Sequence, residues 1–386
     1  MTKKLFSAAL IFSLLTLAAC GTAPEPENTV SPETTSATSA PAATTEPVQS
    51  EGSTLPSQST LQPETSAATT VPSDTGTSAS ETSEPQTEPA QTEPAAYSFV
   101  FDPYSVSSEY ADIYGEEFTA AYRGLADAFI NYETTCPCPS EEIFSALFGA
   151  LDSCMPYFSS DAVLTYDSFD PETKTLTIHY RSATKEEHDA AYLDFISSVE
   201  TYFENGLAEN DSDFVKAVAL YRNFASVISY DLAAEDVSAY SALVGHNGIA
   251  HSFAQGYAYL LRLAGIEANT CGGLSADGSA AHEWVVFRLD GQWFYADPTY
   301  ENGETGGFGL SYFGTDNSER KDAGYDPTYF GVGSTGQLWA SSLNVEGNDF
   351  DFLRGSTSFV IDRNSSSLTL SNGITVNFSE LPGGTK

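Results

Sequence analysis

The segment that decides the fold reads GIAHSFAQGYAYLLRLAGI and occupies residues 248–266. From Phe253 onward, apolar and aromatic side chains recur at the three- and four-residue spacing of one buried helix face. Gly265 stands where such a helix would end. The pattern predicts a loop that enters a buried helix near residue 250.

A β-hairpin is predicted after this helix. A short strand at residues 267–270 precedes a longer strand at residues 281–289, and Asp290-Gly291 is typical of a two-residue hairpin turn. The return strand is predicted at residues 293–300. In such a hairpin His282 and Asp297 can meet at the open end, and a histidine oriented by an aspartate is the base half of a nucleophilic triad.

Together these segments resemble the bacterial transglutaminase-like superfamily, which has a papain-like cysteine-enzyme fold. The resemblance covers residues 230–326 and rests on the 248–266 segment, on His282 at the start of a Trp-containing strand, and on the sequence Asp-Gly-x-Trp-x-x-x-Asp-Pro-Thr at residues 290–299. It implies an α+β fold with a core of helices packed on an antiparallel sheet. His282 and Asp297 match the catalytic His and Asp of the family.

One position departs from the family pattern. Members carry the catalytic cysteine directly after Gly-Val or Gly-Ile, and this chain has Ala250 there, with no gap between residues 248 and 266. A helix N-terminus favours thiolate, but alanine has no lone pair with which to attack. The sequence therefore predicts a relative that lacks its nucleophile.

Other candidate nucleophiles are few. Ser252 would face about 200° away from residue 250 on a helix. Cys271 lies 11 residues before His282 and is the alternative nucleophile, against the simpler interpretation of a buried or disulfide-bonded cysteine. His251 and His282 without a placed carboxylate are weak support for a metal site. We therefore expect no metal and no cofactor.

The first twenty residues predict export. Lys3 and Lys4 precede an apolar run at residues 5–17, which is short for a membrane span. The sequence Leu-Ala-Ala-Cys at residues 17–20 resembles the bacterial lipobox. This resemblance implies cleavage before Cys20 and lipid attachment to it, whereas a chance cysteine after an ordinary secretory signal is the alternative.

The composition and net charge of the chain indicate which partners it is expected to bind. Residues 21–96 are rich in Ser, Thr, Pro and Glu, carry 11 acidic and no basic residues, and predict a disordered tether. The whole chain has 53 acidic and 15 basic residues, a net charge of −38, which argues against nucleic acid as a partner. The expected partners are the membrane, through lipid on Cys20, and cell-wall peptide or a surface protein.

The remaining organisation follows from local patterns. Helices are predicted at residues 109–130, 143–151, 186–203 and 213–228, and paired strands at 162–166 and 175–180. The predicted divisions are a signal peptide at 1–20, the tether at 21–96, an α+β subdomain at 97–212, the transglutaminase-like domain at 213–340, and a small β element at 341–386. Four further cysteines leave disulfides or free thiols open: Cys136, Cys138, Cys154 and Cys271.

Three functions agree with the sequence. The first is a lipid-anchored protein outside the cytoplasm that uses a transglutaminase-like cleft to bind peptide or cell-envelope material without catalysis. The second is an active cysteine-type transglutaminase or peptidase that uses Cys271. The third is a purely architectural surface domain.

Overall fold

The computed structural model describes residues 95–275, 277–278, 280–322, 324 and 343–385. The predicted signal peptide, Cys20 and nearly all of the predicted tether lie outside these residues. The described residues belong to one compact unit. Within the described part of the chain, no helix is both long and apolar enough to cross a membrane.

An antiparallel sheet of four strands carries the predicted hairpin. Its order is β11 (Phe313–Thr315), β10 (Gln292–Ala296), β9 (Ala281–Leu289) and β8 (Ala268–Leu274). Leu289 pairs with Gln292, and both turn residues have positive φ, 46° at Asp290 and 82° at Gly291, as a type I′ turn requires. The hairpin prediction is confirmed, and the strand predicted at 267–270 continues to Leu274.

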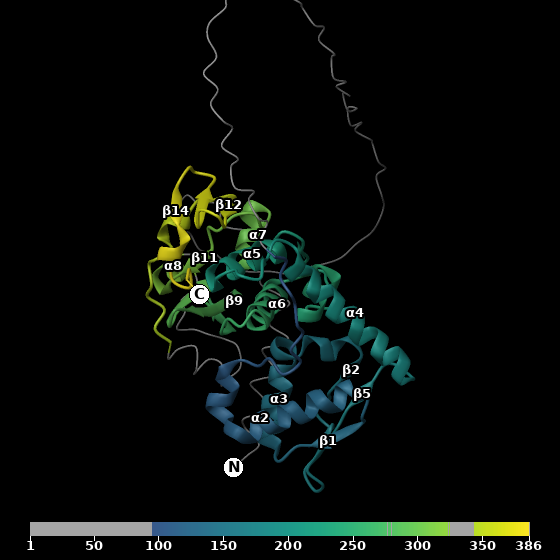
Figure 1. Cartoon of the computed structure of the whole chain (residues 1–386). Coiled ribbons are helices and arrows are strands. Elements are labelled where there is room, and N and C mark those ends of the chain that lie inside the picture. The colour runs from purple at the N-terminus through teal and green to yellow at the C-terminus, as the bar shows by residue number, and fades with distance from the viewer. Residues whose placement is uncertain (1–94, 276, 279, 323, 325–342, 386) are drawn as a thin grey trace, which may run out of the picture. The chain divides into compact units, whose positions relative to one another are not determined.

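Helix α6 (Ala250–Leu263) packs across β8 and β9, as predicted from the 248–266 segment (Figure 1). Its large apolar side chains from Phe253 to Leu261 are fully buried, and each such residue contributes about 1.5–3 kcal/mol by leaving water. A Cβ on Gly256 would lie 2.6 Å from the ring of Phe224, so glycine lets α6 approach helix α5 (Asp213–Ala225). Gly265 ends the helix with φ of 83°.

The predicted return strand is too long. The observed strand β10 ends at Ala296, and Pro298–Thr305 forms helix α7 instead. Asp297 is the N-cap, because its Oδ1 accepts a hydrogen bond of 3.1 Å from the backbone N–H of Tyr300, and Pro298 takes the first helical position. The turn into α7 therefore fixes the orientation of the Asp297 carboxylate.

The N-terminal part contains helices and short strands, as predicted, with different pairing. Val163 pairs with His179, but Leu176 pairs with Phe169, because a turn at Ser168 interrupts the predicted strand 162–166. The elements are α2 (Ser108–Ile130), β1 (Thr135–Pro137), α3 (Glu141–Cys154), η1 (Pro156–Ser160), β2 (Ala162–Val163), β3 (Phe169–Asp170), β4 (Thr175–Thr177), β5 (His179–Tyr180) and α4 (Lys185–Glu204).

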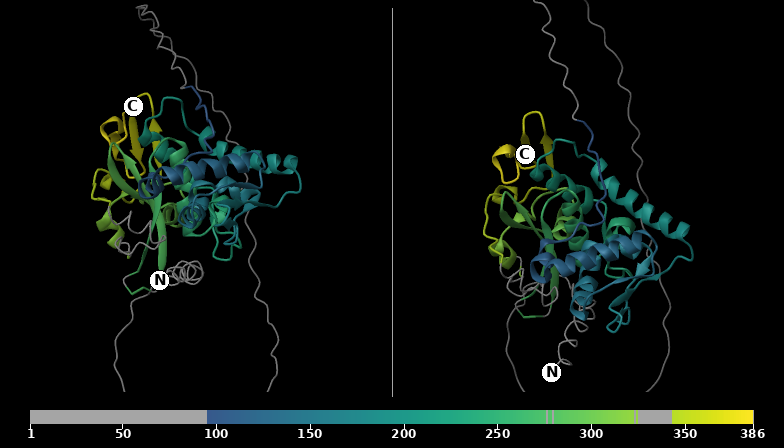
Figure 2. Two further views of the ribbon diagram at one scale, coloured as in Figure 1. Left: turned by 90° about the horizontal axis from the view of Figure 1, so that it is seen from below. Right: turned by 60° about the horizontal axis from the view of Figure 1, so that its bottom comes forward.

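Three short C-terminal strands form the predicted β element, coloured yellow in Figure 2. Arg363 joins it to the rest of the unit by an ion pair of 2.6 Å with Asp211. The elements not yet given are β6 (Ser229–Tyr230), η2 (Ser241–Gly245), β7 (Asn247–Gly248), α8 (Asn317–Asp322), η4 (Asp351–Leu353), β12 (Phe359–Asp362), β13 (Ser367–Leu370), β14 (Thr375–Asn377) and η5 (Phe378–Glu380).

Candidate functional site

His282 and Asp297 meet at the end of the hairpin. His282 lies near the start of β9, and Asp297 follows β10 directly. Nε2 of His282 donates to Oδ2 of Asp297 at 2.6 Å. Both residues are buried, with 4% and 0% of their surface exposed. The approach expected from the hairpin is thus present, whereas a catalytic role for the pair stays a prediction.

Arg320 completes the surroundings of Asp297. Its Nη1 donates to the same Oδ2 at 2.8 Å, from helix α8. Burial acts to raise the pKa of Asp297, but the neighbouring His282 and Arg320 outweigh it and hold the pKa at about 2. Asp297 is therefore ionised at neutral pH. No local pattern in the sequence indicates this contact, because Arg320 lies 23 residues further along the chain.

Aromatic rings surround His282. The Tyr300 ring stacks on the imidazole with centroids 4.6 Å apart, and the Tyr312 ring lies 5.3 Å from Tyr300. Both tyrosines are partly exposed, whereas Trp284, 6.0 Å from the imidazole, is fully buried. The two tyrosines give the site an accessible aromatic surface.

Ala250 is the first residue of α6 and is 7% exposed. Its neighbour His251 hydrogen-bonds Glu283, the residue after His282, with 2.5 Å between Nδ1 and Oε2. Ala250 directly precedes His251, and His282 directly precedes Glu283, and it is His251 and Glu283 that are in contact. The structure brings the beginning of α6 to the part of β9 that carries His282, and the side chain at position 250 is a methyl group.

His251 is held between two carboxylates. Besides Glu283, its Nε2 donates to Oδ2 of Asp152 on α3 at 2.7 Å. Both ring nitrogens donate, which requires the imidazolium form. Burial acts to lower the pKa of His251, but Glu283 and Asp152 outweigh it and raise the pKa well above its ordinary value. Within the described residues, no group of three or more His, Cys, Asp or Glu side chains is arranged to hold a metal ion.

Replacing His251 should lower stability in a pH-dependent way. The unfolded imidazole titrates near pH 6.5, so the ion cluster contributes fully below that pH and its contribution is lost as pH rises through the higher folded-state pKa. Because the side chain is 31% exposed, we expect His251→Gln to lower the free energy of unfolding by about 1 kcal/mol at pH 6 and by less in strong base. Urea unfolding across pH measures this, with the exposed His179→Gln as control. An equal deficit at every pH would contradict it.

Neither alternative nucleophile has the surroundings of one. The Ser252 hydroxyl donates to the Val237 carbonyl and accepts from the Ile249 N–H, and it is fully buried. Cys271 lies on β8 opposite Trp284 and is 1% exposed. Burial raises the pKa of its thiol well above the ordinary value. All four described cysteines are buried free thiols.

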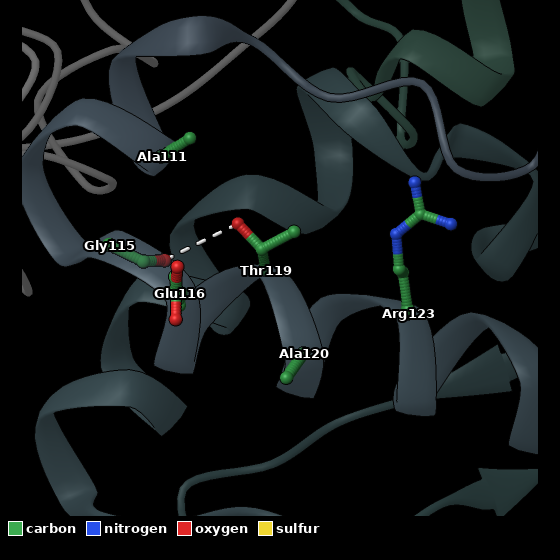
Figure 3. Close-up of a pocket in the computed structure, with 6 residues that line it drawn as sticks. All are labelled: Ala111, Gly115, Glu116, Thr119, Ala120 and Arg123. Carbon is green, nitrogen blue, oxygen red and sulfur yellow. Dashed lines mark hydrogen bonds between the residues drawn. The ribbon is translucent and has the colours of Figure 1, made fainter.

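A surface pocket lies on a different element. Figure 3 shows it on helix α2, where Gly115 has non-helical φ and ψ of 69° and −155°. Its lining residues are Ala111, Gly115, Glu116, Thr119, Ala120 and Arg123. None of the predicted site residues lines this pocket.

Comparison with known proteins agrees with the predicted fold. Residues 201–298 match the transglutaminase-like superfamily, so the chain contains a domain of that superfamily and has its papain-like fold. A search of curated proteins finds no match.

Three solved structures are similar over part of the chain. A candidate cysteine protease from Cytophaga hutchinsonii shares 16% identity over 27% of this chain and 37% of its own, with a TM-score of 0.24. A TGase shares 18% identity over 32% and 40% of the two chains, with a TM-score of 0.24. The periplasmic domain of TgpA from Pseudomonas aeruginosa, bound to ethylmercury, shares 22% identity over 28% and 44%, with a TM-score of 0.22. The chain spans less than half the length of each.

Proposed function

We propose that this protein is a lipid-anchored binding protein outside the cytoplasm. Its transglutaminase-like domain binds peptide or cell-envelope material and does not cleave or cross-link it. Lipid on Cys20 holds the chain to the membrane, and residues 21–96 separate the folded unit from it.

The observation that carries this proposal is Ala250 at the first position of α6. His282 and Asp297 are paired at 2.6 Å, as a base held by a carboxylate would be. A triad without its nucleophile retains only a small fraction of its catalytic rate. We infer that a domain that has lost its nucleophile in this way keeps a surface that holds a ligand.

An active enzyme with Cys271 as nucleophile is the second candidate. A thiol attacks as the thiolate, and burial against Trp284 opposes the formation of that anion at Cys271. This environment favours a structural role for Cys271 and therefore supports the binding proposal.

The groups close to His282 and its neighbour Glu283 suit a peptide better than a purely apolar ligand. Partly exposed Tyr300 and Tyr312 offer flat apolar surface with hydroxyl groups. Glu283, the residue after His282, and its partner His251 are 16% and 31% exposed and offer charge. A few polar groups placed next to aromatic side chains are typical of sites that orient a polar ligand.

Binding can be tested with soluble cell-wall peptides and the purified full chain. We expect saturable binding by isothermal titration, weakened at least about tenfold in Tyr300→Ala because the ring that stacks on His282 is lost. Val360→Ala, which removes an exposed side chain on β12, is the control and should bind as the wild type does. Absence of saturable binding in the wild type would favour the architectural alternative.

A further inference from the structure

A buried carboxyl group contacts the backbone of Tyr312, one of the two tyrosines of the site. This is Glu301, which lies on α7 one turn after Asp297 and has none of its surface exposed. Helix α7 packs against α5 (Figure 1), and the loop after α7 returns to Glu301 at residues 309 and 312. A Cβ on Gly309 would overlap with the Oε1 atom of Glu301, so glycine lets the loop pass this closely.

Three hydrogen-bond donors surround the Glu301 carboxyl group, and none of them is a cation. Oε2 accepts from the Tyr312 N–H at 2.9 Å and lies 3.4 Å from the Tyr221 hydroxyl, whereas Oε1 accepts from the Thr305 hydroxyl at 2.8 Å. Burial raises the pKa of Glu301 to about 7, because these hydrogen bonds only partly oppose the desolvation of the charged form. Both protonation states are therefore populated near neutral pH.

The Thr305 hydroxyl can accommodate both protonation states of Glu301. Its Oγ1 lies 2.8 Å from Oε1 of Glu301 and 2.9 Å from the Glu301 carbonyl oxygen, and it accepts from the Gly309 N–H at 3.0 Å. When Glu301 is ionised, the hydroxyl proton points to the carboxylate. When Glu301 is protonated, its own proton can be donated to Oγ1, and the hydroxyl proton turns to the carbonyl oxygen. A proton can thus be gained or lost without leaving a buried polar group unpaired.

The other titratable groups near Glu301 leave its charge unpaired. On α7, the negative charge of exposed Glu304 acts to raise the pKa of Glu301 further, and Asp297 is engaged with His282 and Arg320. Burial raises the pKa of Tyr221 and Tyr257 well above the ordinary value, so both are uncharged. The groups on the neighbouring elements are Tyr221 on α5, Tyr257 on α6, Tyr230 on β6, Tyr312 in the loop, and Arg354 after η4, which pairs with Glu319.

We propose that Glu301 is a proton-binding positioning residue: its ionised carboxylate holds the backbone of Tyr312 firmly, and protonation loosens that hold. A hydrogen bond to a carboxylate is about twice as strong as one to a neutral acceptor. The carbonyl oxygen of Tyr312 accepts from the Asp297 N–H at 2.9 Å, so the same residue is tied to the start of α7. The proton on Glu301 therefore changes how firmly the aromatic surface beside His282 is held.

The behaviour of Glu301 in the chain without ligand does not depend on the proposed function. Its consequence for binding does rest on that function, because it assumes that a ligand lies against Tyr300 and Tyr312. The two levels are tested by different measurements, so that one can fail without the other.

NMR of the full chain between pH 5 and 9 tests the first level. In the wild type, the carbon-13 signal of the Glu301 carboxyl group should titrate with a midpoint near pH 7, and the amide signal of Tyr312 should shift with the same midpoint. A Glu301 midpoint near the ordinary value of about 4.5 would overturn the proposal. So would a Tyr312 amide signal that does not follow the titration of Glu301.

Variants show whether this carboxyl group is the cause. Glu301→Gln keeps an acceptor for the Tyr312 N–H but cannot ionise, so the Tyr312 amide shift near pH 7 should disappear. Glu304→Gln is the matched control, because it removes a carboxylate of the same helix that contacts the Tyr312 hydroxyl rather than its backbone. It should keep the titration, with a slightly lower midpoint because a negative neighbour is gone. Persistence of the shift in Glu301→Gln, or its loss in Glu304→Gln, would contradict the assignment.

Soluble cell-wall peptides are the probe for the second level. We expect the ratio of affinities at pH 8 and pH 6 to be at least about threefold larger in the wild type than in Glu301→Gln, because only the wild type gains the carboxylate. Comparing the two proteins cancels the titration of the histidines and of the peptide. Equal ratios would overturn the link between Glu301 and binding. Absence of binding by the wild type at both pH values would contradict the proposed function, while the NMR titration would still decide the role of Glu301.

Discussion

Ala250→Cys is expected to create a thiol that iodoacetamide alkylates near neutral pH, at least about tenfold faster than the same thiol in Ala250→Cys/His282→Ala. The N-terminus of α6 favours an anion at residue 250, and the His282 imidazole, held by Asp297, can accept the proton of the thiol or stabilise the thiolate. The new side chain adds one sulfur atom to a position that is 7% exposed, so a small reagent is required.

The chain offers a low background for this experiment. Cys136, Cys138, Cys154 and Cys271 are at most 5% exposed, and Cys20→Ser as parent removes the remaining cysteine. Mass spectrometry of the peptide that contains residue 250 reports the rate at the chosen site. His179→Ala serves as the control for loss of a histidine elsewhere. Equal, slow alkylation with and without His282 would show that the surroundings of residue 250 do not activate a thiol.

Cys20→Ser is expected to move nearly all of the protein from the membrane fraction to the medium. A single acyl chain gives marginal, reversible binding, so stable attachment of a lipoprotein depends on the several chains carried by this one cysteine. Immunoblots of the pellet and the medium measure the change.

Cys271→Ala is the matched control for this experiment, because it removes a cysteine that is buried in the folded unit and has no connection with the signal. It should remain in the membrane pellet together with the wild type. Retention of Cys20→Ser in the pellet would contradict the lipid-anchor proposal. This holds whether or not a signal peptide directs export.

The segments with strong local signals were predictable from the sequence. Helix α6 follows from the spacing of its apolar residues and from Gly265, and the β9–β10 hairpin follows from Asp290-Gly291 between two apolar strands. Because the hairpin aligns its strands residue by residue, it also predicts that His282 and Asp297 come together. Asp297-Pro298 is a local signal for a helix start, and Asp297 is the N-cap of α7. The sequence prediction missed this helix start because it continued the return strand through Tyr300.

Contacts between distant segments were not predictable in this way. Asp152 reaches His251 across 99 residues, and Arg320 reaches Asp297 from a short helix with no periodic pattern. Each partner is a common surface residue type, and only the packing of α3 on α6 and the position of α8 beside Asp297 make it part of the site. The interrupted pairing of residues 162–166 has a local origin, since the Ser168 hydroxyl accepts a hydrogen bond from the Thr165 N–H and stabilises a turn there.

The central claim is that this transglutaminase-like domain binds without catalysis, and mass spectrometry of peptide substrates tests it most directly. Glutamine-containing and cell-wall peptides would be incubated with an excess of a primary amine and with the full chain, as wild type, Cys271→Ala or Ala250→Cys. The account predicts that the wild type and Cys271→Ala leave every peptide mass unchanged, with neither amide hydrolysis nor amine incorporation above the enzyme-free control. Conversion by the wild type that is lost in Cys271→Ala would contradict the account and identify Cys271 as the nucleophile.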